Sequence, residues 1–561
     1  MVPAAGWLRG YGREDLSRDF SAALVITVML VPQSMAYALL AGLPPIYGLY
    51  ASTVPAIVYA VFGTSRHMPV GPPALMALLT FTSVSAIAKP GTDEYIGYVL
   101  LLAFMVGMLQ LALGLLRMGF LTNFISHPVL SGFIYASAVI IALSQVKHFL
   151  GIEASDDHST LGMLASIIQK IENTNWIPLA IGLLSVTAIV LLGKFAPRMP
   201  GTLVAVVAAT LAVYLLSLGN RGVDIVGEVP RGLPQLSVPA LDFEVMRTLV
   251  PAALIVAFVG FIESISVAKA IAAREKYKID SNQELRALGL ANVGAAFFSG
   301  FPVAGSFSRT AVQYQSGGRT QMASIITALM VIATLLVLTP LFYYLPNAAL
   351  AAVIVVAVYK LLDFREARYM FKIRGADGLT LLITFLVTLL VGIEQGIIAG
   401  ATFALLAFLR RTAYPEIIEL GYVEKEETFK GLRSYPEART FPEALIMRFD
   451  ARLYFANIPF LEEYLISEIP DRPKLEYVII DCRGINGIDV TALEGLEDLI
   501  SEYRARNIKI LFAHMKKQIR ERLRKSGWEQ KFGDICYPTT RDALRDIGLL
   551  EEHETSDPGV R

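Results

Sequence analysis

Long apolar runs, separated by short polar and charged segments, fill most of the chain from Phe20 to about Leu409. A membrane-spanning helix needs about 20 apolar residues, and many of these runs approach that length. Counting shorter and fused runs, the pattern predicts roughly fourteen spanning segments. The clearest runs are Val99–Leu116, Val129–Leu143, Ile177–Leu192, Leu249–Phe261, Ile325–Leu341, Leu345–Leu362 and Leu379–Val391.

The pattern changes beyond Ala413, where charged residues become dense. Short β-branched runs at Tyr477–Ile480 and Ile508–Phe512 alternate with amphipathic stretches such as Ala492–Tyr503. This alternation predicts a separate α/β domain of ordinary domain size. We therefore expect a cytosolic N-terminal segment (1–19), a membrane domain for transport (20–412), a linker (413–442), an α/β domain (443–556) and a tail (557–561).

Composition supports the membrane assignment and excludes other classes. Apolar residues make up 54% of the chain and charged residues only 17%, too few charges for a typical soluble protein. Positive and negative charges balance, so nothing suggests the basic face of a nucleic-acid-binding protein. Cys482 and Cys536 both lie in the charged portion and are expected to be ordinary thiols of a reducing cytosol. The spans show no nucleophile–base pair or metal-spaced His/Cys cluster, so we expect no enzyme, no cofactor and no metal.

Basic residues predict the orientation, because cytosolic loops of membrane proteins are enriched in Lys and Arg. An even number of spans starting in the cytosol places both termini inside, as expected for a multi-pass protein of the inner (plasma) membrane. The predicted cytosolic set is Arg66, Arg117, Lys194, Arg198, Arg274, Lys276, Lys278, Arg365, Arg368, Lys372, Arg374, Arg410 and Arg411, and the opposite set is mainly Lys89, Lys147, Lys170, Arg221, Arg231 and Arg247.

Three segments are interrupted by proline and glycine. Val31–Gln33 lies within the first segment, Val70–Pro73 opens the third, and Pro302–Ser306 opens the tenth. Such breaks free backbone groups that lipid cannot satisfy, so they must face protein or a watery cavity. The third and tenth segments hold matching places in the two halves, which predicts an inverted repeat with a site near the bilayer midplane.

Several motifs resemble those of the sulfate permease (SulP) family. They are PQSMAYALLAGLPPIYGLY (32–50), GTSRH (63–67), VGP (70–72) and GSFSRTA (305–311). The resemblance covers nearly the whole chain. It implies a polytopic α-helical membrane protein, with about seven plus seven segments divided into core and gate domains, usually as a homodimer. It also implies a C-terminal cytosolic α/β STAS domain, similar to bacterial anti-sigma-factor antagonists, over about Ala444–Glu552.

The third and tenth segments are expected to begin as short strands and to continue as half-helices whose N-terminal amides face one shared volume. Unpaired N–H groups and the positive end of the helix dipole attract anions. Glycines let an anion approach the backbone, and the serine, glutamine and tyrosine side chains can donate hydrogen bonds. The predicted substrate-binding residues are Gln33, Tyr37, Gly71, Pro72, Ala74, Gly305, Ser306, Phe307, Ser308 and Arg309. The resemblance places the pair Ser308–Arg309 at the anion site, whereas simple helix packing is the alternative for both serines and for Tyr37.

Arg309 is costly in hydrocarbon, by about 2.5 to 3.5 kcal/mol on the insertion scale, so it needs a partner or a cavity. Glu263 is the isolated intramembrane carboxylate, in the eighth segment. It can neutralise Arg309, bind a cation or carry a proton, and we favour the coupling proton. Bicarbonate-transporting relatives tend to place a hydroxyl residue four positions later to help bind sodium. Val267 stands there, which weakens the case for sodium.

These features favour a secondary transporter that moves an inorganic oxyanion by elevator-like alternating access. The tenth-segment motif favours sulfate with proton symport. Bicarbonate or dicarboxylate transport, coupled to protons or sodium, and an anion channel or exchanger remain the alternatives. One proton on Glu263 suffices for a monoanion but only marginally for a dianion, whose entry against 100 mV costs about 4.6 kcal/mol.

The C-terminal domain carries Asp481 at the end of a predicted strand and Asp489 as the cap of the next helix. Leu493, Leu496 and Ile500 should form the buried stripe of that helix. The antagonist family carries a phosphorylatable serine directly after the aspartate, whereas Val490 stands here. We therefore favour dimer contact or a regulatory protein partner over phosphorylation.

Overall fold

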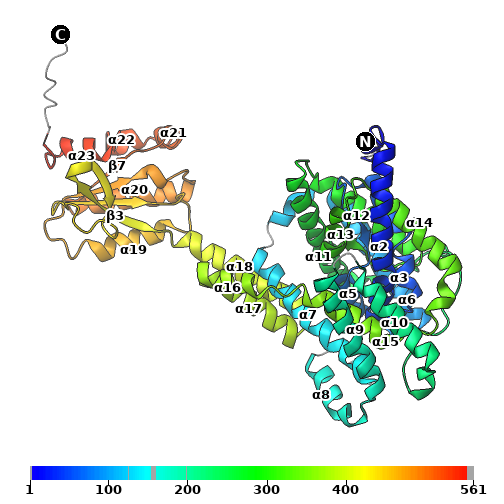
Figure 1. Cartoon of the computed structure of the whole chain (residues 1–561). Helices are drawn as coiled ribbons and strands as arrows, with labels where there is room; N and C mark the ends of the chain where they lie inside the picture. The colour runs from blue at the N-terminus through cyan, green and yellow to red at the C-terminus, as the bar shows by residue number, and fades with distance from the viewer. Residues whose placement is uncertain (1–2, 124–125, 153–159, 197–198, 552–561) are drawn as a thin grey trace. The chain divides into compact units, whose positions relative to one another are not determined.

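The computed structural model describes residues 3–123, 126–152, 160–196 and 199–551 (Figure 1). Two compact units divide the chain, Met1–Ala404 and Leu405–Arg561. The end of the predicted α/β domain, the tail 557–561 and Arg198 lie outside the described residues.

The first unit is helical. Its first half contains α1 (Ala4–Leu8), α2 (Arg13–Leu40), α3 (Ile46–Tyr50), α4 (Val54–Phe62), α5 (Ala74–Val84), α6 (Asp93–Leu115), α7 (His127–Leu150), α8 (Thr160–Lys170), α9 (Trp176–Phe195) and α10 (Gly201–Leu215). Its second half contains α11 (Phe243–Arg274), α12 (Ser281–Phe297), α13 (Phe307–Gln315), α14 (Met322–Val337), α15 (Asn347–Tyr359), α16 (Phe364–Ile373), α17 (Gly375–Leu390) and α18 (Ile393–Ala413), the last of which continues into the second unit. Short 3₁₀ turns occur at Met118–Asn123, Ile171–Asn173, Leu218–Arg221 and Thr339–Phe342.

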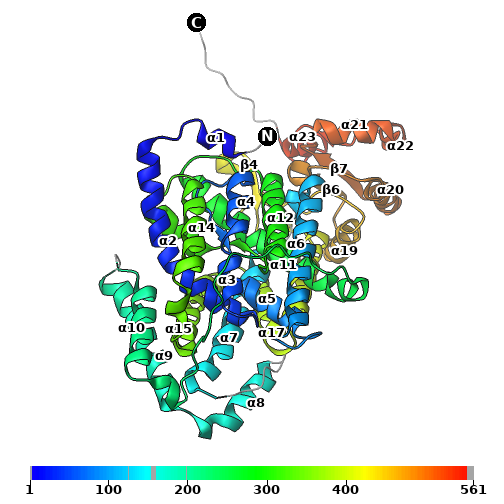
Figure 2. The ribbon, with the colours of Figure 1, turned by 90° about the vertical axis from the view of Figure 1, so that its right-hand side faces the viewer.

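Seven helices within the described ranges are long and apolar enough to cross a membrane. Helices of the second half pack against helices of the first half. Helix α12 lies between α4 and α6 (Figure 2), and α14 packs in turn against α2 and α4. Farther along the chain, α7 contacts α15 and α17, and α15 also contacts α9. Many exposed apolar side chains remain on α9, α10 and α18, as expected for surfaces that face lipid.

Two very short strands join the halves at the predicted breaks. Strand β1 (Val70–Gly71) pairs antiparallel with β2 (Ala304–Gly305), with Val70 opposite Gly305 and Gly71 opposite Ala304. Helix α5 follows β1 and helix α13 follows β2. The prediction that both segments begin extended and continue as half-helices is therefore confirmed. Pairing the strands satisfies backbone groups that lipid would leave unpaired.

The predicted break at Val31–Gln33 is wrong. Helix α2 continues through Pro32, so the first segment is a single helix. Proline removes only one backbone donor, and tight packing of the surrounding buried helix tolerates that loss. The Ser34 hydroxyl donates to the carbonyl oxygen of Val31 at 3.0 Å, so the helix continues through the turn that follows the proline. Helix α2 also begins at Arg13, within the segment 1–19.

The second unit is built around a six-stranded sheet in the order β4-β3-β5-β6-β7-β8. Its strands are β3 (Ile417–Val423), β4 (Thr428–Gly431), β5 (Ala444–Phe449), β6 (Tyr477–Asp481), β7 (Lys509–Ala513) and β8 (Cys536–Tyr537). Its helices are α19 (Ile458–Glu468), α20 (Val490–Ala505), α21 (Lys517–Lys525), α22 (Trp528–Phe532) and α23 (Thr540–Asp546), with 3₁₀ turns at Glu424–Glu426 and Cys482–Gly484. Strands β5 to β8 are parallel, and β3 and β4 extend the sheet antiparallel from within the segment 413–442, which we had expected to be a linker.

The elements predicted for this unit are confirmed. Asp481 ends β6, and the carboxylate of Asp489 accepts the backbone N–H of Ala492 at 2.8 Å, capping α20. Leu496 and Ile500 are buried on α20 and Leu493 is half-buried, whereas Val490 is exposed. Cys482 and Cys536 are free thiols, and burial raises the pKa of both.

Candidate anion-binding site

The first turns of α5 and α13 follow directly from the paired strands. Pro73 precedes α5 and Ser306 precedes α13, and neither side chain caps its helix. The first N–H groups of a helix have no partner within the helix. Because β1 and β2 are adjacent, both sets of free N–H groups and both positive dipole ends lie close to the strand pair. This arrangement favours a negative charge.

Arg309 connects the two half-helices. Its side chain is 1% exposed although it lies in the first turn of α13. The guanidinium donates to the carbonyl oxygens of Pro72 at 2.7 Å, Gly71 at 3.1 Å and Ala304 at 3.4 Å. Two of these acceptors belong to the other half of the chain. Arg309 therefore holds β1 and β2 together at the place where both helices begin.

Among the described residues, Arg309 forms no ion pair with a carboxylate, and its Nε has no partner. Glu263 is half-buried, and its Oε2 has no hydrogen-bond partner. The direct Glu263–Arg309 ion pair, which was the alternative to a proton-linked role for Glu263, is thus not formed. Backbone carbonyls accept hydrogen bonds from the guanidinium, and no carboxylate of the described residues contacts it.

The hydroxyls of Ser306 and Ser308 lie 3.1 Å apart. Ser306 is half-buried, while Phe307 and Ser308 are exposed on the same turn as the buried Arg309. The first turn of α13 therefore presents two hydroxyls and its free N–H groups on the accessible side. Phe307 is 47% exposed beside them.

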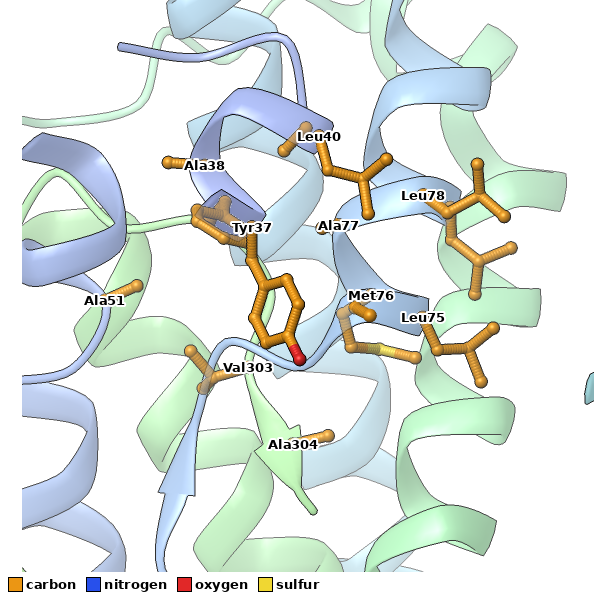
Figure 3. Close-up of a cluster of buried hydrophobic side chains, with 14 of the residues drawn as sticks. Tyr37, Ala38, Leu40, Ala51, Leu75, Met76, Ala77, Leu78, Val303 and Ala304 are labelled. Atoms are coloured by element: carbon orange, nitrogen blue, oxygen red, sulfur yellow. The ribbon is translucent and has the colours of Figure 1, made fainter. Parts of the chain in front are cut away.

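Gln33, Tyr37 and Ala74 lie in the protein interior near the strands. They are 6%, 5% and 7% exposed, respectively. Figure 3 shows the Tyr37 hydroxyl pointing toward the strands and the first turn of α5, beside Met76. The Oε1 of Gln33 is buried without a partner. Helix α2 thus contributes both polar side chains, although it is continuous where we had predicted a break.

The two glycines have different surroundings. A Cβ on Gly71 would lie 3.7 to 3.8 Å from the guanidinium atoms of Arg309, an ordinary contact distance. A Cβ on Gly305 would lie 2.3 Å from the sulfur of Met68, and the Gly305 N–H donates to the Ser264 hydroxyl at 2.8 Å. Gly305 is therefore required by internal packing, and its amide is already bonded within the protein.

Comparison with known protein families identifies both parts of the chain. The model of the sulfate permease family matches residues 16–384. The chain belongs to the sulfate permease family. A STAS domain model matches residues 435–543, within the sheet-containing unit.

Relatives of this sulfate permease member are named as sulfate transporters. The chain is 36% identical over 552 residues to the chloroplastic sulfate transporter 4.1 of Arabidopsis thaliana, covering 95% of this chain and 80% of that protein. It is 33% identical over 561 residues to the probable sulfate transporter MT1781 of Mycobacterium tuberculosis (strain CDC 1551 / Oshkosh), covering 97% of this chain and all of that protein. Among solved structures, the murine anion transporter Slc26a9 in its inward-facing state aligns with a TM-score of 0.87 at 25% identity, covering 97% of this chain and 93% of that one.

The predicted class is confirmed by these comparisons. The chain is a multi-pass membrane protein with a helical transport domain and a C-terminal STAS domain. Its family consists of anion transporters rather than enzymes. The individual residues of the site stay a prediction.

Sequence analysis missed the polar side chains that position the strands of this permease. Asn292 on α12 accepts the N–H of Val303 at 2.8 Å and donates to the carbonyl of Val303 at 3.1 Å, while Gln110 on α6 accepts from Asn292 at 3.0 Å. Ser264 holds Gly305 from α11. The sequence feature that could have revealed these side chains is an isolated amide within an apolar segment, such as Gln110.

The approach to β1 is positioned by a buried carboxylate and an amide. Glu284 is fully buried on α12, where it accepts the hydroxyl of Tyr59 at 2.6 Å and the N–H groups of Thr64 and Ser65 at 2.6 and 3.0 Å. Gln321 donates to the carbonyls of Ser65 and Met68 at 2.7 and 2.9 Å. These contacts explain the structural role of the GTSRH motif, which the sequence showed only as a family signature.

A cavity of about 420 Å³ lies at the other end of α5. Its polar lining includes Thr82, Ser83, Gln145, Thr388 and Glu394, from α5, α7, α17 and α18. None of the predicted substrate-binding residues lines it. We place the candidate site at the start of α5 and α13, because that is where a buried cation without an ion-pair partner among the described residues and the free helix amides coincide.

Proposed function

We propose that this permease takes up sulfate together with protons, binding the anion between the first turns of α5 and α13. The observation that carries the proposal is the state of Arg309, a cation that is 1% exposed and has no acidic partner among the described residues. Isolated buried charges are costly, so a site of this kind is completed by a bound anion. The names of the relatives support sulfate as that anion.

The hydroxyls of Ser306 and Ser308 and the amides of α13 supply donors, and α5 supplies a second set of free N–H groups. Sulfate has only acceptor oxygens, so a site made of donors and positive dipole ends fits its chemistry. Gln33 and Tyr37 are the donors available from α2. Gly71 and Pro72 contribute indirectly, because their carbonyls orient Arg309.

Glu263 is the proposed coupling group. Its Oε2 is buried without a partner, so the carboxyl can take up a proton without breaking a hydrogen bond at that atom. One proton carried with sulfate leaves one net negative charge, which costs about 2.3 kcal/mol against 100 mV. Each unit of pH gradient returns about 1.4 kcal/mol for that proton. Uptake of sulfate with a single proton therefore requires a gradient approaching two pH units, or additional protons.

Alternating access completes the proposal. The half-helices pack on α2 and α11, and α5 also contacts α6, whereas α7, α9, α15 and α17 pack mainly with one another. Movement of the first group against the second would expose the site to each side in turn, as in inverted-repeat transporters. The distribution of basic residues supports a location in the inner membrane of the cell, with both termini of the protein in the cytosol.

The test uses the full-length protein in proteoliposomes. Labelled sulfate, bicarbonate, chloride and succinate are offered separately, with an imposed inward proton gradient and with or without sodium. We expect sulfate uptake that needs the proton gradient and ignores sodium. In Glu263→Gln, uptake should lose its dependence on the gradient, while sulfate binding persists.

Four results would contradict the proposal. Preference for another anion would exclude sulfate as the substrate. Uptake driven by sodium would exclude the proton as the coupling ion. Currents as large as those of ion channels would indicate an open pore and contradict alternating access. A Glu263→Gln protein that keeps the wild-type proton dependence would exclude Glu263 as the coupling group.

A further inference from the structure

Helix α16 joins α15 to α17 and concentrates positive charge on one face. Arg365, Arg368 and Lys372 are spaced three and four residues apart, so they lie on the same side of the helix. Phe364 and Tyr369 flank this basic stripe and are 73% and 63% exposed. These five residues line one shallow hollow on the surface.

The acidic residues of this segment are engaged elsewhere. The Glu366 carboxylate accepts the hydroxyl of Tyr135 on α7 at 2.6 Å and lies 3.3 Å from the ring nitrogen of His127. The Asp363 carboxylate caps the helix by accepting the N–H groups of Arg365 and Glu366. Within the described part of the chain, no carboxylate forms an ion pair with Arg365, Arg368 or Lys372.

The opposite face of α16 is attached to the protein. Glu366, Ala367 and Met370 are half-buried on it, and Phe371 closely approaches Gly378 of α17. Figure 1 shows α16 beside α17, in agreement with their extensive contact. The basic stripe therefore has a fixed direction, away from the helices that hold α16.

The place of α16 in the chain and its basic, aromatic face favour a position at the membrane surface. It is bounded closely by two apolar segments of the membrane domain, α15 and α17. Exposed aromatic rings are favoured at the headgroup level, and basic residues near the surface attract anionic lipids. A soluble anion would use the charges but leave Phe364 and Tyr369 in water, whereas a lipid uses both.

We propose that the basic face of α16 binds the headgroup of an anionic phospholipid, with Phe364 and Tyr369 resting at the boundary of the acyl chains. The lipid supplies the negative charge that Arg365, Arg368 and Lys372 lack. Because Glu366 bonds to α7, the bound lipid anchors the α7–α17 side of the membrane domain to the bilayer surface.

The experiment measures lipid binding to the purified full-length protein by native mass spectrometry. Dioleoyl phosphatidylglycerol and dioleoyl phosphatidylcholine are titrated into wild type and into the triple variant R365Q/R368Q/K372Q. Each basic residue near a membrane surface contributes about fivefold, so the triple variant should bind phosphatidylglycerol roughly 100-fold more weakly. Phosphatidylcholine binding should be the same in both proteins.

A matched control removes the same charge from the STAS domain. Lys517, Arg524 and Lys525 are exposed on α21, and K517Q/R524Q/K525Q should bind phosphatidylglycerol like wild type. Equal losses in the two triple variants would overturn the proposal, as would wild type that does not prefer phosphatidylglycerol. Melting temperatures check that each variant is folded.

Two further arms identify the source of the anion. Inorganic phosphate at millimolar concentration should not displace phosphatidylglycerol, and displacement would indicate a site for free anions instead. The double variant F364S/Y369S keeps every charge and should still weaken binding of the lipid. Unchanged affinity in that variant would overturn the assignment of the aromatic rings to the acyl boundary.

Discussion

Helices α5 and α13 begin in the same way but are built from different residues. Helix α5 runs from Ala74 to Val84 with an apolar sequence, and its first seven residues are buried. Helix α13 runs from Phe307 to Gln315 and carries Ser308, Arg309 and Gln313. Each follows a two-residue strand, and neither has a side-chain cap.

The difference separates two roles in the proposed site. Helix α5 offers backbone amides within a closely packed wall, whereas α13 adds hydroxyls and a charge on a partly exposed turn. Arg309 unites the two, since its guanidinium belongs to α13 and its carbonyl acceptors include Gly71 and Pro72 before α5. Changes on the α13 side should therefore alter anion binding more than equivalent changes on the α5 side.

The largest expected effect is that of Arg309→Met, which removes the buried charge. Hydrogen bonds to charged groups contribute about 1.5 to 3 kcal/mol each, so sulfate affinity should fall by about 100-fold or more. The carbonyls of Gly71, Pro72 and Ala304 also lose their donor, so the melting temperature should fall. Binding is measured by titration of labelled sulfate to the purified protein.

Arg309→Lys is the control for charge without the planar guanidinium. A single ammonium cannot reproduce the fork that reaches Pro72 and Gly71, so we expect intermediate affinity. If Arg309→Met bound sulfate like wild type while remaining folded, the buried cation would have no part in anion binding.

Residue patterns were sufficient for the large elements but not for these contacts. The apolar runs, the strand-like breaks at Val70 and Pro302 and the cap at Asp489 follow from local composition, and all appear in the structure. The break predicted at Pro32 was wrong, because the loss of one backbone donor does not end a helix whose residues around the proline are all buried.

The partner of Arg309 could not be predicted from residue type. Sequence reasoning searches for an acidic side chain and so offered Glu263 as one candidate partner, whereas the acceptors are backbone carbonyls. The Pro72 carbonyl lies 237 positions from Arg309 in the chain. Every residue has a carbonyl, so only the folded pairing of β1 with β2 shows which ones are used.

The second prediction compares the supports of the two strands. Asn292→Leu leaves the buried N–H and carbonyl of Val303 without this partner, so the free energy of unfolding should fall by about 2 to 5 kcal/mol. Gln321→Leu removes bonds to the carbonyls of Ser65 and Met68 but leaves no N–H group unpaired, so its effect should be smaller. Thermal unfolding of the two variants in one detergent checks the order, and a larger loss in Gln321→Leu would contradict it.

A third prediction concerns the two hydroxyls of α13. Ser308→Ala should weaken sulfate binding about tenfold, the lower value for a lost hydrogen bond to a charged ligand. Ser306→Ala should have a smaller effect because Ser306 is more buried and less accessible to an anion. Both hydroxyls contact only each other through side-chain hydrogen bonds within the described residues, so stability should barely change. Affinities that stay at the wild-type value in both variants would assign the serines to packing.

The last prediction distinguishes the two glycines, one in each half. Gly305→Ala places a methyl group 2.3 Å from the Met68 sulfur, so Met68 must move and stability should fall by about 1 to 3 kcal/mol, as in overpacked cores. Gly71→Ala meets only Arg309 at ordinary contact distance, so stability should change by less than about 1 kcal/mol.

The sulfate affinity of Gly71→Ala tests whether the anion occupies the space beside Gly71. If an anion rests against β1 beside the guanidinium, the Gly71 methyl group should weaken binding several-fold in a protein that melts like wild type, because it occupies that space without disturbing the fold. Unchanged affinity in Gly71→Ala would place the anion on the α13 side alone, next to Ser308 and away from the β1 backbone.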